Sequence, residues 1–349
     1  MIPIRFLSDD DVKSILDIRN TVACVERAYV LKAKQRARLF PSISEDLIHG
    51  IADMDIKSGL LDEDDLYGLK LVSWFGSNER IGLPALTGLV MVFDLKNGFP
   101  KAIINARYLT AMRTGAAGAV GVKHLANPDS DVLLVVGTGF QAVFQIAATL
   151  SEVPTIRKVY AFNPLRYDSA EKFLSSIRSE LEKIPEDQYT SSKEHWKHRI
   201  AAVQFIPVEN PLKVLEEADA VITVTPSRKP LIFKEWIRPG THFSCIGADM
   251  PGKQELDVKI FDGAVVFTDD AQQSLTVGEV QCAVKAGLIH EENKPTEIGH
   301  LILGDVKGRK KDTDITIFDS TGIALQDLAV SRFLVSKAEE LNLGRVIHL

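Results

Sequence analysis

Residues 131–150, with the sequence DVLLVVGTGFQAVFQIAATL, decide how the central part of this chain folds. The apolar run at 132–136 is typical of a buried strand, and an apolar helical pattern begins soon after it. Between them lies the pattern G-x-G-x-x-A, formed by Gly137, Gly139 and Ala142. Its first glycine permits a tight turn, its second lets the backbone approach a pyrophosphate, and its alanine allows close helix packing. Because the helix N-terminus also offers amide donors and a favourable dipole, the stretch predicts a dinucleotide-binding turn.

The same alternation of short apolar runs and longer amphipathic stretches continues downstream, which is the pattern of parallel βαβ units. Strands arranged in this way form a doubly wound sheet of the Rossmann type. The polar segment 182–198 has no clear period and is expected to be an extended excursion at the surface. We expect six parallel strands, at 132–136, 158–162, 201–206, 220–224, 242–246 and 265–268.

The two ends of the chain have other patterns. Ser8 and Asp11 form a capping box ahead of one helical pattern, and Asn20 is expected to cap a second helix. Residues 86–93 and 101–105 flank a turn signal and read as an antiparallel hairpin, so the first third of the chain is α+β. Beyond a charged connector we expect a strand at 315–318 and a helix at 324–341.

Composition excludes several classes of protein. The 349 residues suffice for two domains, and the 45% hydrophobic and 25% charged content is that of a globular protein. A net charge of -6 offers no basic surface for nucleic acid. Since no apolar run could cross a bilayer and no secretory signal is visible, we expect a cytoplasmic protein. The expected reduced cysteines, with no disulfide framework and no zinc site, are Cys24, Cys245 and Cys282.

The predicted cofactor site extends to other strand ends. The strand at 158–162 ends in Asn163 and Arg166, where an acid commonly binds the ribose of NAD. Asn163 can still bond the ribose and Arg166 can meet a 2′-phosphate, so we expect NAD or NADP, with a slight preference for NADP. The residues at the ends of the strands expected at 220–224 and 242–246 either line the cofactor or form plain strand-to-loop junctions. The remaining expected cofactor-binding residues are Arg113, Thr114, Phe140, Gln141, Thr223, Thr225, Pro226, Ile246 and Gly247.

Four ionisable residues, Arg38, Lys70, Arg113 and Asp249, have unusual neighbours. A lysine inside an apolar run, such as Lys70, is more often a solubility device on an edge strand than a functional group. Arg113 precedes a small-residue helix that lets a ligand approach, and Asp249 lies in a loop shaped by proline and glycine at a strand end. His195 and His198 are expected to be surface histidines, and no metal site is expected.

These residues lie in blocks that resemble the ornithine cyclodeaminase and mu-crystallin family. The blocks keep the family order across nearly the whole chain, and those from 225 to 257 look most like the archaeal alanine dehydrogenase branch. The matching blocks are GLKLV at 68–72, TAMRTGAA at 110–117, GTGFQA at 137–142, TVTPS at 223–227, GADMPGKQELD at 247–257 and FDSTGIALQD at 318–327.

The resemblance implies a two-domain subunit and a homodimer built through its first domain. It implies an α+β substrate-binding and dimerisation domain over 1–125 and 315–349, and a Rossmann-type NAD(P) domain over 126–314. By family role, Lys70, Arg113 and Arg38 hold the substrate carboxylate, and Asp249 handles protons near the α-amine. Paired cations suit a carboxylate, and Lys70 could polarise or deprotonate the substrate if burial lowers its pKa.

One departure from the family leaves the substrate open. The branches differ at a residue before a Met-Pro motif, and the corresponding segment 50–55 lacks the proline. Asp53 either replaces the glutamate of ornithine cyclodeaminases or is a solvated loop acid. The sequence therefore predicts an oxidoreductase acting at Cα of a small L-amino acid or its imine, by oxidative deamination or by ring closure with ammonia loss. The alternatives are a cyclic imine reductase and a mu-crystallin-like protein that binds NADPH and a small ligand.

Overall fold

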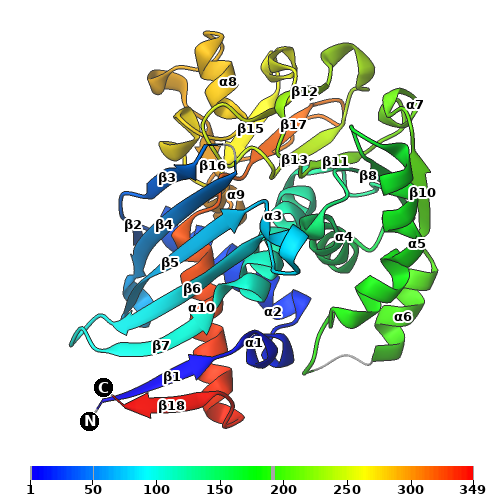
Figure 1. The fold of residues 1–349 in the computed structure, drawn as a ribbon. Helices are drawn as coiled ribbons and strands as arrows, with labels where there is room; N and C mark the ends of the chain where they lie inside the picture. Colours follow the sequence, from blue (N-terminus) through cyan, green and yellow to red (C-terminus); the bar gives the residue numbers. More distant parts are fainter. Residues whose placement is uncertain (1, 50, 190–192, 349) are drawn as a thin grey trace. The chain divides into compact units, whose positions relative to one another are not determined.

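The computed structural model describes residues 2–49, 51–189 and 193–348. The chain forms two compact units, one comprising Met1–Arg113 with Ile323–Leu349 and the other Thr114–Gly322. The first division falls inside helix α3 (Ala106–Leu125), and the second falls just before helix α10 (Ala324–Glu340). The sequence predicts these divisions at 125/126 and 314/315. Figure 1 shows the elements with the labels used below.

The first unit is built on a mixed sheet in the order β18-β1-β7-β6-β5-β4-β2, with β3 paired to β4. The pair β1 and β7 is parallel, and the other pairs are antiparallel, including the predicted hairpin of β6 and β7. The strands are β1 (Pro3–Leu7), β2 (Ala37–Leu39), β3 (Ile43–Ile48), β4 (Ala52–Leu61), β5 (Leu66–Phe75), β6 (Leu86–Asp94), β7 (Pro100–Asn105) and β18 (Arg345–His348).

Helices cover one face of this sheet. Helix α10 packs on β4, β5 and β6, and α2 (Ile18–Ala33) packs on α10 (Figure 1). The position of Gly68 requires glycine, because a Cβ there would lie 2.3 Å from the Met91 carbonyl oxygen, and it would also lie 2.9 Å from the Leu328 side chain of α10. The predicted capping box at Ser8 begins α1 (Asp9–Ile15). The prediction for the next helix was wrong, because Asp17, and not Asn20, is its N-cap and accepts a bond from the Asn20 amide.

The second unit contains a sheet in the order β10-β9-β8-β11-β13-β17-β15-β16, with every pair parallel. Its centre is buried on both faces, as the continuous apolar run of β8 predicts. A second, two-stranded sheet joins β12 (Arg228–Ile232) and β14 (Gln254–Leu256). The strands of the large sheet are β8 (Val132–Val136), β9 (Lys158–Phe162), β10 (Gln204–Val208), β11 (Ala220–Thr223), β13 (His242–Cys245), β15 (Val265–Thr268), β16 (Thr296–Glu297) and β17 (Thr316–Asp319).

The connections of the second unit are mostly helical. The doubly wound parallel sheet that the sequence predicts is confirmed. The helices are α4 (Phe140–Glu152), α5 (Tyr167–Lys183), α6 (Lys193–Ala201), α7 (Leu212–Leu215), α8 (Val280–Lys285) and α9 (Ile298–Leu303).

Three sequence-based predictions for this unit need correction. The polar segment 182–198 is not simply extended, because α6 begins at Lys193 and buries Trp196, whose indole N–H donates to the Leu181 carbonyl at 3.1 Å. The third strand consequently begins at Gln204 and not at residue 201. The strand near 315–318 was expected to complete the first domain, but β17 lies between β13 and β15 in the parallel sheet.

Candidate functional site

The turn after β8 has the geometry that its glycines predict. Gly137 adopts φ +116°, and a Cβ there would lie 2.7 Å from the Val224 carbonyl oxygen, so the position requires glycine. Its amide donates to the Phe162 carbonyl at 2.8 Å, which fixes the turn beside the end of β9. Gly139 is the N-cap of α4, and a Cβ there would meet no atom within 4 Å. Space is therefore open beside the second glycine.

The residues at the start of α4 fit a pyrophosphate. No side chain caps the helix, so its first amides are available to a ligand. The Gln141 Oε1 atom is buried and has no hydrogen-bond partner within the described residues. Phe140 is half exposed, whereas Ala142 is fully buried, as close helix packing requires. This turn is the place where the chain could hold a dinucleotide.

Asn163 and Arg166 lie at the end of β9. The Asn163 amide donates to the Thr138 hydroxyl at 2.7 Å, and its oxygen accepts from the amides of Leu165 and Arg166. The Arg166 side chain is exposed, with a guanidinium nitrogen 3.5 Å from the Asp168 carboxylate. The structure thus brings Asn163 to the glycine turn and leaves Arg166 accessible to an anion.

The residues expected after β11 and β13 lie at the ends of neighbouring parallel strands. Thr223, Thr225 and Ile246 are buried. The amides of Thr225 and Gly247 both donate to the carboxylate of Glu255, at 2.7 and 3.1 Å. Sequence analysis missed Glu255, although the residue lies in one of the matching blocks. Burial raises the pKa of Glu255 to about 7, although hydrogen bonds from Thr225, Thr223 and Gly247 act to lower it.

Asp249 lies in the loop after β13. Its side chain is half exposed, and its Oδ1 accepts a hydrogen bond from the Lys253 ammonium at 2.5 Å. The amide side chain of Gln281 donates to the Met250 carbonyl and accepts from the Gly252 amide, which ties the loop to α8. The carboxylate is therefore held on a supported loop.

A second cluster lies within the first unit, on β5, α3 and α10. Lys70 Nζ lies 2.9 Å from the Asp327 carboxylate, and Arg113 Nε lies 3.1 Å from the same group. Lys70 is 2% exposed and Arg113 8% exposed. We call these three residues the Lys70 cluster. Two buried cations thus share one buried anion, an arrangement that favours a further anion.

Burial dominates the titration of the Lys70 cluster. It lowers the pKa of Lys70 to about 7; the charge of Arg113 acts in the same direction and Asp327 opposes it. Burial alone would raise the pKa of Asp327, but the charges of Arg113 and Lys70 outweigh it and lower that pKa. Asp327 is therefore the anion that holds two cations inside the protein.

Further residues support this cluster, and sequence analysis missed them. Arg113 donates to the Gln326 side-chain oxygen at 3.1 Å, and the Gln326 amide donates to the Tyr29 hydroxyl at 2.5 Å. Lys57 is the cross-strand partner of Lys70, and its charge lowers the pKa of Lys70 further. The register of the β4 and β5 hairpin is the signal that could have found Lys57.

The structure also places the other residues that the sequence singled out. Lys70 is on β5 between β4 and β6, so the edge-strand interpretation was wrong. Arg38 is exposed on β2, with its guanidinium 5.6 Å from the centre of the Phe40 ring. The Thr114 carbonyl accepts from the Gln145 amide at 2.9 Å. Asp53 lies on β4 and not in a loop.

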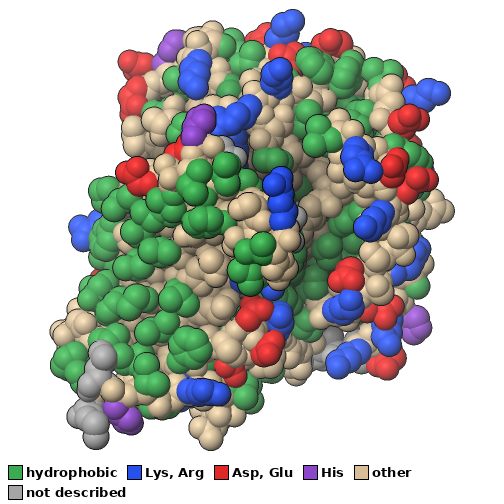
Figure 2. Space-filling view, viewed as in Figure 1, with side chains coloured by type: hydrophobic (Ala, Val, Ile, Leu, Met, Phe, Trp, Pro, Cys, Tyr) green, Lys and Arg blue, Asp and Glu red, His purple; other side chains and the backbone are tan. Residues whose placement is uncertain are grey.

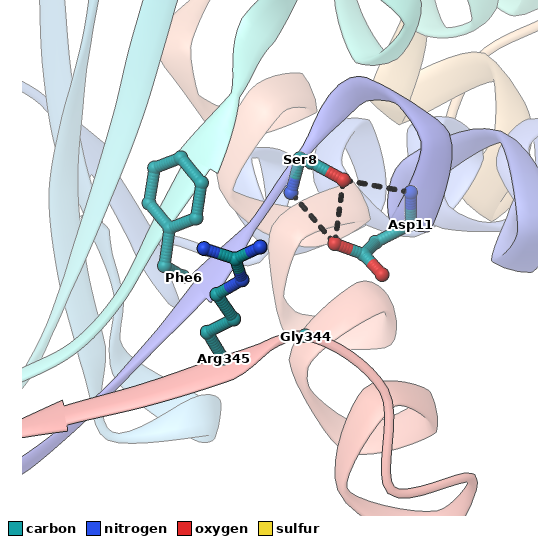
Figure 3. A pocket seen from close by; sticks show the side chains of 5 residues that line it. All are labelled: Phe6, Ser8, Asp11, Gly344 and Arg345. Carbon is teal, nitrogen blue, oxygen red and sulfur yellow. Dashed lines mark hydrogen bonds between the residues drawn. The ribbon is translucent and has the colours of Figure 1, made fainter.

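A pocket at the chain ends lies apart from the predicted residues. Its volume is about 450 Å³, and its lining comprises Phe6, Ser8, Asp11, Gly344 and Arg345. Figure 3 shows that the Ser8 and Asp11 polar groups bond each other within the capping box. The Ser8 hydroxyl lowers the pKa of Asp11, and we assign the pocket no function.

Two absences concern the described part of the chain only. Within residues 2–49, 51–189 and 193–348, no group of three or more His, Cys, Asp or Glu side chains is arranged to hold a metal ion. Across the same residues, no helix has the length and apolar character needed to cross a membrane.

A parallel doubly wound sheet with a glycine turn at a helix N-terminus defines the class of Rossmann-type dinucleotide-binding proteins. The family model for the ornithine cyclodeaminase/mu-crystallin family matches residues 5–342. The chain belongs to this family. The predicted family and fold class are therefore confirmed, and with them the prediction of an enzyme.

Two relatives and one solved structure illustrate the similarity. An alanine dehydrogenase of Archaeoglobus fulgidus is 36% identical over 341 residues, covering 98% of this chain and 97% of the relative. An iminosuccinate reductase of Paracoccus denitrificans is 31% identical and covers 98% of this chain and 99% of the relative. The structure of an archaeal alanine dehydrogenase dimer with bound NAD superposes with a TM-score of 0.87 at 33% identity, over 100% of both chains.

Proposed function

We propose that this protein is an NAD(P)-dependent oxidoreductase that acts at Cα of a small L-amino acid or of the corresponding imine. The Lys70 cluster carries the proposal, because two buried cations share a single carboxylate. A substrate carboxylate would bring the missing negative charge and accept from both cationic side chains. The named relatives, an alanine dehydrogenase and an iminosuccinate reductase, act on substrates of this class.

Each group of the chain then has a chemical task. Oxidation of an α-ammonium group to an iminium ion releases one hydride and one proton, and NAD(P), when bound, supplies the hydride acceptor. Lys70 and Arg113 hold the substrate carboxylate. Asp249 accepts the proton from the α-ammonium and must exchange its ion pair with Lys253 for that group. Arg38, which is exposed on β2, is proposed as a further carboxylate contact.

The proposed cofactor site is the glycine turn with the strand ends around it. The α4 amides and the open space at Gly139 take the pyrophosphate, and Asn163 takes the ribose. We propose NADP as the slightly preferred cofactor, because Arg166 is accessible and no acid stands at the end of β9. The other proposed contacts are Arg113, Thr114, Phe140, Gln141, Ala142, Thr223, Thr225, Pro226, Ile246 and Gly247.

Three reactions share this chemistry and differ in the fate of the imine. Attack by water releases ammonia and a 2-oxo acid, whereas attack by a side-chain amine closes a ring with loss of ammonia. The reverse direction reduces an imine, and the likeness to an iminosuccinate reductase supports this as the second candidate. Turnover of a panel of substrates distinguishes the three.

The test is nicotinamide absorbance during incubation with NAD or NADP and a panel of L-amino acids, and with NADH or NADPH and 2-oxo acids plus ammonia or cyclic imines. We expect turnover with at least one member, and loss of turnover with near-native cofactor affinity in Lys70→Ala and in Asp249→Ala. Cofactor binding without turnover of any member would instead support a binding protein.

We also propose that the protein is a cytoplasmic homodimer assembled through its first unit. Figure 2 shows apolar side chains gathered over the strands of that unit. One row of cross-strand partners runs across this sheet, from Ile43 on β3 through Ile56 on β4 and Leu71 on β5 to Leu89 on β6. Its members Ile43, Leu71 and Leu89 are exposed. This row lies on the face opposite Lys70, since alternate residues of β5 point to opposite faces. The three cysteines are free, and we propose that a reducing compartment keeps them so.

A further inference from the structure

Three buried carboxylates of the second unit have no task in the proposed chemistry. Glu255, Glu279 and Asp319 are each 0% exposed, and together we call them the carboxylate series. Burial raises the pKa of all three, to about 7 for Glu255, to about 8 for Asp319 and well above the usual value for Glu279. Buried acids are costly, so their retention calls for a specific explanation.

Each carboxylate of the series accepts hydrogen bonds from two backbone amides. Asp319, at the end of β17, accepts from the amides of Glu279 and Val280 at 3.0 and 2.9 Å. Glu279 accepts from the amides of Glu255 and Leu256 on β14 at 2.5 and 3.2 Å. The series therefore runs from the central sheet through the start of α8 to β14, and it ends at the side chain of Glu255.

Glu255 differs from the other two because its two donors come from separate loops. Thr225 lies just after β11 and Gly247 just after β13, which are neighbouring parallel strands. Ligands of doubly wound sheets bind at the carboxyl ends of such strands. The two loops approach so closely that a Cβ at Gly247 would lie 2.3 Å from the Thr225 carbonyl oxygen. One carboxylate thus spans the two loops.

An ionised carboxylate is the strongest acceptor for this pair of amides. A glutamine of the same size has a single acceptor oxygen, so it could accept one amide and would direct an N–H group at the other. A protonated carboxyl group keeps a strong acceptor only at its carbonyl oxygen, since its hydroxyl oxygen is a weaker acceptor. The negative charge is therefore needed for the spacing of the two loops and not only for filling space.

We propose that Glu255 is a positioning residue of the cofactor site, whose carboxylate fixes the loops after β11 and β13 in the arrangement that binds a nicotinamide dinucleotide. This inference rests on the proposed function, because it takes NAD(P) as the ligand. Glu255 acts through the backbone of Thr225 and Gly247 and is not assigned a contact with the substrate.

The test measures the dissociation constant of NADH, by its fluorescence, at pH values from below to above 7. NADH is used because it lacks the 2′-phosphate of NADPH, whose own pKa lies near 6. In the wild type we expect affinity to strengthen as pH rises through about 7, as Glu255 ionises. In Glu255→Gln we expect a dissociation constant about tenfold larger at high pH, with no such pH dependence.

The surrounding titratable groups define the control. The charge of Glu255 acts on Glu279 at the N-cap of α8, on Asp319 from β17 and on Cys245 from β13, and Asp269 after β15 acts on Asp319; burial raises the pKa of all four groups. Glu279→Gln changes a member of the series whose carboxylate accepts from the amides of Glu255 and Leu256 on β14. It should lower the melting temperature as Glu255→Gln does, yet keep the gain of NADH affinity with pH. A purely structural role of Glu255 would make the two variants behave alike.

The outcomes separate this inference from the proposed function. If the wild type binds NADH and turns over substrate, but Glu255→Gln keeps the native affinity and pH profile, the inference alone is wrong. Should Glu255→Gln fail to fold by circular dichroism, a wild-type NADH affinity that is constant across the same pH range would refute it. A wild type that does not bind NADH at any pH would overturn both proposals.

Discussion

Lys70 remains inside the protein because Asp327 lies 2.9 Å from its ammonium group, on a helix that begins more than 250 residues later. Breaking such a buried pair by removing one partner typically costs about 3–5 kcal/mol. Arg113 shares the same carboxylate, so no cation of the Lys70 cluster is isolated. The pair thus keeps positive charge at a buried place that water does not solvate. Selective binding of a carboxylate requires such a charge.

The lowered pKa of Lys70 predicts how substrate capture depends on pH. Below about pH 7 Lys70 is protonated and attracts a carboxylate, and above it the charge is progressively lost. We therefore expect kcat/KM, which reports ionisations of the free enzyme, to fall as pH rises above about 7. In Lys70→Arg the guanidinium keeps its charge, so this fall should disappear even if the rate is lower. The measurement uses saturating cofactor, so that the expected effect of Glu255 on cofactor binding does not enter, and a kcat/KM that instead rises through pH 7 would contradict carboxylate capture by protonated Lys70.

Arg166 allows a sharp test of cofactor choice. Its guanidinium is exposed beside Asp168, and a 2′-phosphate would compete with that carboxylate. Arg166→Ala should weaken NADPH binding by at least about tenfold and leave NADH binding within about twofold, because a charge-assisted contact is typically worth about 1.5–3 kcal/mol. Calorimetric titration with both cofactors measures the difference. An equal effect on the two cofactors would exclude the phosphate contact.

Among single residues, the sequence singled out the candidate site residues more readily than the residues that hold them in place. Lys70 and Arg113 stand out locally, one in an apolar run and the other before small residues. Asp327 and Glu255 do not, because what distinguishes them is burial against distant backbone and charge. Long-range contacts of this kind leave no spacing in the sequence from which they could be predicted.

The glycine turn shows how one element can meet two separate demands. Gly137 is required by the backbone, because its φ is positive and a Cβ there would lie too close to the Val224 carbonyl oxygen. Gly139 has ordinary backbone angles and open space where a Cβ would project. The first glycine is therefore needed by the fold, and the second is expected to be needed by the ligand.

Alanine substitutions separate these two roles. Gly137→Ala should destabilise the protein by about 1–3 kcal/mol, because it imposes a strained φ and a close contact. Gly139→Ala should leave the melting temperature within a few degrees of the wild type but weaken NAD(H) affinity by about tenfold or more, since the methyl group would occupy the proposed pyrophosphate space. Thermal unfolding and fluorescence titration measure the two effects. Equal loss of stability in both variants would contradict the assignment.

Elements were predictable where their signals are local. The β8 strand, the α4 helix and the capping box of α1 depend on neighbouring residues, and all three occur as predicted. The α6 helix was not predicted, because its polar sequence buries only Trp196 and Ile200. The position of β17 in the parallel sheet was missed as well, because pairing with β13 and β15 depends on topology and not on its own residues.

The first unit carries the surface through which we propose that the whole molecule assembles. Helices α2 and α10 cover one face of its sheet, whereas the other face carries an exposed apolar row. Exposed apolar patches of this kind usually mark interaction sites. A second copy of the chain is the proposed partner, and the related archaeal alanine dehydrogenase is described as a dimer.

Leu71 lies in the middle of this row, between Ile56 and Leu89 on the neighbouring strands, and is 39% exposed. Leu71→Glu would place a charge in the proposed interface, where burying an unpaired carboxylate costs several kcal/mol. We therefore expect a dimer in the wild type and mostly monomer in the variant, as measured by light scattering coupled to size exclusion. Leu288→Glu changes a leucine of similar exposure in the second unit and should remain dimeric. A wild-type monomer, or a Leu71→Glu dimer of native stability, would contradict assembly through this face.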